Sequence, residues 1–119
     1  MSGPDSPGIL SPADEAPLLL WAQIWLRDHD VAGFEAYERR AARVLARHGA
    51  RIERAFRPLD AAEDPALPFE IHLLRFPDRA ALTAWQADPD RAALQEERER
   101  LIARTTVIAL RTVTGYGEG

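Results

Sequence analysis

The segment from residue 69 to residue 113 constrains the fold of this chain more than any other part. Apolar and β-branched runs at its two ends predict strands, and the stretches between them predict helices. Pro77-Asp78 ends the first strand, and Asp88-Pro89-Asp90 separates the two helices, because both motifs are typical of helix starts. The expected elements are a strand (69–76), a short helix carrying Trp85, a second helix (91–104) and a closing strand (106–113).

A strand and a long helix are expected upstream of this segment. Residues 18–26 are apolar on both faces of a strand, with Leu18, Leu20, Ala22, Ile24 and Leu26 on one face and Leu19, Trp21, Gln23 and Trp25 on the other. Asp28 or Asp30 can cap a helix that begins near Val31, and Gly49 can end it in the left-handed conformation. Glu35 and Glu38 are expected on the solvent side of this helix.

A further strand is expected at residues 51–57, where side chains alternate. Its expected faces carry Ile52, Arg54 and Phe56 on one side and Arg51, Glu53, Ala55 and Arg57 on the other. Charge along a strand discourages stray pairing, so this is expected to be an edge strand. A proline-rich, acidic connection at residues 58–68 then leads into the strand at 69–76, which should pair antiparallel with it.

The resulting order of elements, βαββααβ, predicts an α+β protein of the ferredoxin-like type. Such a protein has a four-stranded antiparallel sheet with helices on one face, and its other face is bare. Here the bare face carries large apolar groups, which soluble monomers rarely expose over a wide area. We therefore expect a homodimer, a dimeric α/β barrel, with Trp21, Gln23 and Trp25 in the interface.

The 119 residues are enough for one domain, which we expect at 18–114 between a flexible leader (1–17) and a flexible tail (115–119). A net charge of -4, with arginines interspersed among acids, gives no basic stripe for nucleic acid. The absence of cysteine excludes disulfides and thiolate metal sites. No apolar run approaches the roughly 20 residues of a membrane span. We expect a cytoplasmic, bacterial protein with no membrane or nucleic-acid partner.

Several short motifs resemble those of one bacterial family. They are Ala22-Gln23-Ile24 with Asp28, Phe34-Glu35-Ala36-Tyr37, His48-Gly49-Ala50-Arg51, Arg75-Phe76-Pro77-Asp78 with Ala80-Ala81, Trp85, and Asp88-Pro89-Asp90. The family is the domain of unknown function "thirteen-thirty". The resemblance implies membership of the dimeric α/β-barrel superfamily, whose other branches include cofactor-independent antibiotic-biosynthesis monooxygenases, haem-degrading enzymes, muconolactone isomerases and chlorite dismutases.

His72 is the candidate catalytic residue. It shares a strand face with Glu70 and Phe76, and since Phe76 leads into a helix, this face should lie beneath the helices. An imidazole there could act as a base or hold a ligand. The alternative is a core histidine hydrogen-bonded to a neighbour. The candidate ligand-binding residues around it are Tyr37, Arg54 and Trp85, although Glu70 could instead hold Arg54 in a structural ion pair.

The other candidate groups fit structural roles. His48 is expected to interact with the C-terminus of its helix, and His29 lies in a polar turn. Asp88 is expected to be a helix cap. The three histidines form no i, i+4 pair and no HExxH motif, so neither a metal site nor a cofactor is expected.

The sequence favours a protein that binds a small hydrophobic or aromatic molecule between sheet and helices. By superfamily analogy alone, it could instead be a cofactor-independent monooxygenase or isomerase. A third possibility is a non-catalytic dimeric interaction module. A pocket with convergent polar groups would favour the enzyme, and a pocket filled by its own side chains would favour the interaction module.

Overall fold

The computed structural model describes residues 17–117. The expected leader therefore lies outside the described residues except for Pro17, as do the last two residues of the expected tail. The elements in chain order are β1 (Leu18–Leu26), α2 (Val31–Arg47), β2 (Arg51–Phe56), the 3-10 turn η1 (Ala61–Glu63), β3 (Glu70–Phe76), α3 (Arg79–Gln86), α4 (Pro89–Ala93), α5 (Gln95–Leu101) and β4 (Ile102–Leu110).

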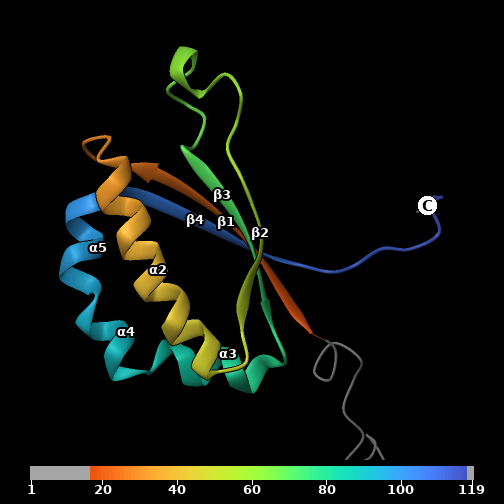
Figure 1. Cartoon of the computed structure of the whole chain (residues 1–119). Coiled ribbons are helices and arrows are strands. Elements are labelled where there is room, and N and C mark those ends of the chain that lie inside the picture. The colour runs from red at the N-terminus through yellow and green to blue at the C-terminus, as the bar shows by residue number, and fades with distance from the viewer. Residues whose placement is uncertain (1–16, 118–119) are drawn as a thin grey trace, which may run out of the picture.

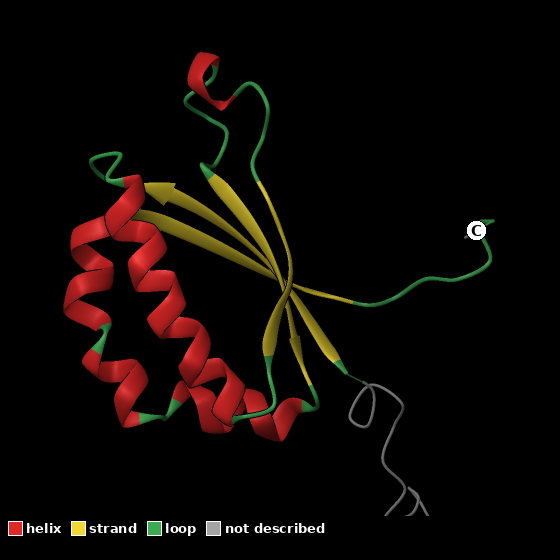
Figure 2. Cartoon of the chain, in the orientation of Figure 1, coloured by secondary structure: helices red, strands yellow, loops and turns green. Residues whose placement is uncertain are grey.

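The strands form one antiparallel sheet in the order β2-β3-β1-β4, and all the longer helices lie on one side of it (Figures 1 and 2). This is the expected ferredoxin-like arrangement, with β2 at an edge. The sheet register places Ala22 opposite His72 and Leu18 opposite Phe76, so these side chains share the helix-covered face. Among the described residues, no helix is both long and apolar enough to cross a membrane.

The core lies between the sheet and the helices in two clusters of buried side chains. One contains Leu18, Leu20, Leu45, Ala50 and Phe76, and the other contains Ile24, Phe34, Tyr37, Leu101 and Ile102. Phe34 and Phe76 are fully buried and anchor α2 and the end of β3, respectively. The cavity described below lies between the same two layers.

Helix α2 begins and ends as its sequence predicts. The Asp30 side chain accepts a hydrogen bond from the Gly33 backbone N–H at 2.9 Å, which caps the helix. A Cβ atom at Gly33 would collide with that carboxylate. Gly49 has a φ of +73°, the left-handed conformation in which glycine commonly stops a helix.

The second half of the chain departs from expectation in its helix boundaries. The stretch expected as one helix over residues 91–104 belongs to two short helices, α4 and α5, and the chain becomes extended at Ile102. Ile102 pairs with Leu26, and the Arg27 backbone N–H donates to the Leu101 carbonyl at 2.9 Å. Pairing with β1 and burial of Leu101 and Ile102 thus override the local preference for helix.

Candidate functional site

A cavity of about 450 Å³ lies between the helix-covered face of the sheet and the helices. Its apolar lining comes from four strands, from helices α2 and α3, and from Leu94 between α4 and α5. The apolar residues are Leu20, Ala22, Ile24, Ala41, Val44, Leu45, Ile52, Leu74, Leu82, Trp85, Leu94, Ile102, Val107 and Ala109. The space is therefore not filled by the protein's own side chains, and its size is in the range of small-molecule sites.

Polar side chains enter the cavity from six different elements. They are Tyr37 and Glu38 of α2, His72 of β3, Gln86 of α3, Arg91 of α4, Gln95 and Arg98 of α5, and Thr105 of β4. A few convergent polar groups in an otherwise apolar hollow are typical of a ligand site. Of the residues expected in a pocket, Tyr37, His72 and Trp85 lie in this lining.

His72 is 4% exposed and is flanked by a carboxylate at each ring nitrogen. Its Nε2 lies 2.5 Å from Glu70 Oε2, and its Nδ1 lies 3.6 Å from Glu38 Oε2. Glu70 also accepts a hydrogen bond from Arg57 Nε at 2.7 Å, and Arg57 Nη2 reaches Glu35 Oε2 at 2.9 Å. These five residues form a continuous polar chain from the cavity at Glu38 to the surface at Glu35.

The pKa values of the two carboxylates beside His72 are shifted in opposite directions. Burial raises the pKa of Glu38 above its ordinary value, although the charge of His72 partly opposes this. Burial also acts to raise the pKa of Glu70, but hydrogen bonds from His72 and Arg57 outweigh it and the pKa is lowered. Glu38, at the cavity, is thus the carboxyl that takes up a proton more readily.

Sequence reasoning missed Glu38, which it placed on the solvent side of α2. The signal was present, since Glu38 follows Phe34 by four positions and precedes Ala41 by three, the spacing of one helix face. Its side chain is 19% exposed. The neighbouring Tyr37 is buried, and burial with the nearby Glu38 charge raises its pKa to about 12.

Two arginines of the second half, Arg91 and Arg98, also line the cavity and were not singled out from the sequence. The Arg91 guanidinium lies 4.3 Å from the centroid of the Trp85 ring. Arg98 Nη2 donates to Thr105 Oγ1 at 2.7 Å. Their seven-residue spacing, two helical turns, was the available signal.

Arg54 is not in the cavity, and its expected place there is wrong. A register shift between Ile52 and Arg54 puts Ile52 opposite Leu74 on the helix side but Arg54 opposite Leu73 on the other side. Arg54 is exposed, with its guanidinium 5.3 Å from the Phe56 ring. The arginine that meets Glu70 is Arg57.

The residues expected at a dimer interface lie together on the bare face of the sheet. Trp21 packs 5.9 Å from Phe56, measured between ring centroids, and the Arg104 guanidinium lies 3.9 Å from the Trp25 ring. Gln23 Oε1 accepts a hydrogen bond from Thr106 Oγ1 at 3.0 Å. The neighbouring Ile108, Phe56 and Leu110 are 55%, 37% and 37% exposed. We call this surface the bare face.

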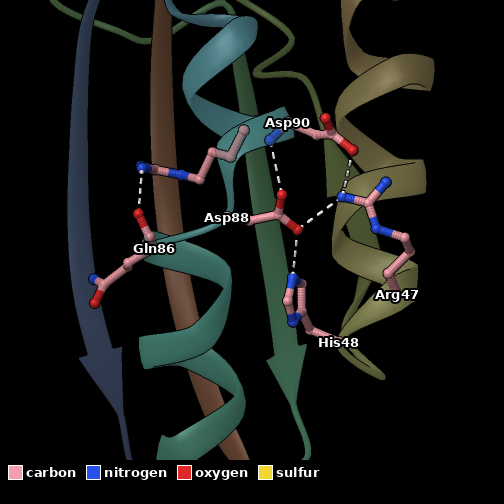
Figure 3. Close-up of polar contacts among 6 residues, drawn as sticks. Arg47, His48, Gln86, Asp88 and Asp90 are labelled. Atoms are coloured by element: carbon pink, nitrogen blue, oxygen red, sulfur yellow. Dashed lines mark hydrogen bonds and ion pairs between the residues drawn. The ribbon is translucent and has the colours of Figure 1, made fainter.

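His48 and Asp88 form a structural cluster at the end of α2 (Figure 3). Asp88 caps α4 by accepting from the Asp90 backbone N–H at 2.8 Å, as expected. The Asp88 carboxylate also meets Arg47 Nη2 and His48 Nε2, both at 2.7 Å, so His48 joins α2 to α4 through its ring. Hydrogen bonds from Arg47 and His48 hold the pKa of Asp88 well below its usual range.

Across residues 17–117, no group of three or more His, Asp or Glu side chains is placed to hold a metal ion.

Solved structures share this fold at low sequence identity. One is a protein of unknown function from Rhodopseudomonas palustris, with TM-score 0.68, 18% identity and 85% of each chain covered. A dabb family protein with a ferredoxin-like fold from Mesorhizobium loti gives TM-score 0.61 and 16% identity, over 82% of this chain and 98% of the other. SnoaB, a cofactor-independent oxygenase from Streptomyces nogalater, gives 0.62 and 17%, over 86% and 98%.

No curated protein matches the chain significantly. The sequence model of a domain of unknown function, DUF1330, matches residues 23–112. This match spans most of the described chain, from β1 through β4, and includes all the cavity-lining residues from Tyr37 to Ala109. The resemblance seen in the short motifs is thereby confirmed, and the chain belongs to the DUF1330 family.

Proposed function

We propose that this protein binds a small, largely apolar or aromatic molecule in the cavity between the sheet and the helices. The observation that carries this proposal is an unfilled space of about 450 Å³ whose apolar lining is interrupted by a few convergent polar groups. Trp85 offers an aromatic surface within it, supported by Phe76 at 5.4 Å between ring centroids.

A second candidate is proton-transfer catalysis, as in an isomerase or a cofactor-independent oxygenase. The observation that favours it is the Glu38 carboxyl at the cavity, with a raised pKa and with His72 behind it. In this role Glu38 would accept a proton from a C–H bond of the ligand, and His72 would position Glu38. Similarity to SnoaB adds an analogy of fold only.

We further propose a homodimer formed through the bare face, in a bacterial cytoplasm. The exposed Ile108, Phe56 and Leu110 beside Trp21 and Trp25 support self-association, because a second copy would remove them from water. If the cavity binds nothing, the remaining candidate function is a non-catalytic dimeric interaction module, which the bare face would support.

Binding is tested by titrating the full chain with small aromatic acids and amides and following heat release and tryptophan fluorescence. Ala41→Phe projects a ring into the cavity and should weaken binding by about tenfold or more. Ala46→Phe places the same ring on an exposed position of α2 and should leave binding unchanged. Equal binding by both variants, or no binding by the native chain, would refute the proposal.

The catalytic candidate is tested separately by nuclear magnetic resonance of aromatic ketones in heavy water. Catalysed exchange of the α-hydrogens that is lost in Glu38→Gln and reduced in His72→Gln would support it. Exchange at the rate of buffer alone, with ligand binding intact, would exclude proton transfer and leave binding as the function.

A further inference from the structure

The cavity is lined by hydrogen-bond donors that are only partly satisfied by acceptors within residues 17–117, which indicates the chemistry of its ligand. We propose that the ligand is a carboxylate with an apolar or aromatic body, and that Tyr37, Arg91 and Arg98 bind its carboxylate group. This inference rests on the proposed binding function and specifies the class of molecule that is bound.

Tyr37 supplies the first observation. It is 6% exposed and lines the cavity, yet its hydroxyl makes no hydrogen bond to any residue within 17–117. Buried tyrosine hydroxyls usually have a partner, so an acceptor in the cavity is the missing component. With a pKa of about 12 the hydroxyl keeps its proton at neutral pH and acts as a donor.

The two arginines supply the second observation. The half-buried Arg40 and the exposed Arg57 each meet a carboxylate, Glu97 and Glu70 respectively. Arg91 and Arg98 are also half-buried, but neither forms an ion pair with any acid in the part of the chain that the structure describes. A guanidinium has five N–H donors, and Arg98 uses Nη2 on Thr105.

Tyr37, Arg91 and Arg98 line the same cavity. The charges of Arg98 and Arg91 both bear on the Tyr37 hydroxyl and lower its pKa against the larger effect of burial. Arg91 lies over the Trp85 ring and Arg98 is hydrogen-bonded to Thr105 of β4, so both are held in place before a ligand arrives. A preorganised pair of planar forks beside a hydroxyl donor matches a carboxylate.

The neighbouring Glu38 and the lining limit the ligand further. The Glu38 carboxyl would repel a multiply charged group such as a phosphate, whereas the two arginines offset the single negative charge of a carboxylate. The apolar residues of β1, α2, β3 and β4 around the remaining space require an apolar body. We therefore expect a monocarboxylate of aromatic or similar compact shape.

The test compares three acids with their uncharged amides: benzoate, cinnamate and naphthoate. Calorimetric titration of the full chain should give tighter binding of each acid than of its amide. Arg98→Gln and Arg91→Gln should each weaken acid binding by about tenfold or more, because each removes a charge-assisted hydrogen bond. Both should change amide binding less than about twofold. Arg43→Gln removes the same charge from an exposed position of α2 and should change neither.

The possible results separate this inference from the proposed function. Equal affinity for acids and amides, with both lost in Ala41→Phe, would overturn the proposal that the ligand is a carboxylate. It would leave the proposal that the cavity binds a small molecule. Loss of acid binding to the same degree in Arg43→Gln would also overturn it, since net charge alone would then explain the preference. Absence of binding by every acid and amide would overturn both proposals. Tyr37→Phe should weaken acid binding at unchanged thermal stability, and unaltered binding would remove Tyr37 from the site.

Discussion

His72 Nδ1 and Glu38 Oε2 face each other across 3.6 Å at the lining of the cavity, although the two residues come from β3 and α2. The other ring nitrogen of His72 meets Glu70 at 2.5 Å, so the imidazole lies between two carboxylates. The pair therefore joins the core of the fold to its candidate ligand site. A substitution in it should affect stability and binding in different proportions, depending on which residue is changed.

His72→Ala should destabilise the protein by about 3–5 kcal/mol, because it leaves buried Glu70 and Glu38 without their shared partner. Urea unfolding followed by circular dichroism measures this loss. His72→Gln keeps a hydrogen-bond donor and should lose less. A loss of ligand binding at unchanged stability would contradict this structural role and make His72 a direct ligand-binding residue.

Glu38→Gln should alter how stability depends on pH. The folded protein holds the Glu38 proton more tightly than the unfolded chain, since burial raises its pKa above 4.5. The stability that Glu38 contributes to the wild-type protein is therefore present below pH 4.5 and is lost as the pH rises through the raised pKa. The glutamine does not titrate, so the variant should gain stability relative to wild type as the pH rises above 4.5 and through the raised pKa of Glu38. A constant or falling difference in unfolding free energy would contradict this.

The Asp88 cluster gives a prediction that does not involve the cavity. Asp88→Asn should lower the melting temperature more than Asp90→Asn, because Asp88 meets Arg47, His48 and the α4 cap whereas Asp90 meets Arg47 alone among these (Figure 3). The lowered pKa of Asp88 means that its contribution is present at neutral pH and disappears only in strong acid. The two variants should therefore converge as the solution is acidified, and equal effects at neutral pH would refute the role of the cluster.

The helix-covered face could be predicted from the sequence because it follows a strict two-residue period. That period put His72 and Phe76 beneath the helices, where they lie. The same rule failed at Arg54, because the register shift after Ile52 interrupts the alternation and sequence periodicity does not signal such a shift.

The polar part of the site was less predictable, for a different reason. Glu38 lies on the inner face of α2, but a carboxylate at such a position is normally assigned to the solvent side. Arg91 and Arg98 reach the cavity from two short helices, α4 and α5, where a single helix was expected, and β4 begins early at Ile102. These placements depend on tertiary packing, which local propensity does not contain.

Ile108→Glu should prevent dimer formation through the bare face. Ile108 is 55% exposed in the single chain, so a charge there costs the monomer little, but in an apolar interface it would be buried without a partner. Light scattering of the native protein should give twice the 13.3 kDa chain mass, and the variant should give the chain mass itself. Leu59→Glu, at a position 99% exposed, is the matched control and should remain dimeric. A native protein that scatters as a single chain would refute the dimer.

The cavity is tested most directly by a crystal structure of the protein soaked with naphthoate. We expect the aromatic body of naphthoate to lie against Trp85 and its carboxylate to lie within hydrogen-bonding distance of Tyr37 and Arg98, with Arg91 alongside. Native side chains filling the space between sheet and helices, or naphthoate bound elsewhere with this space empty, would contradict it.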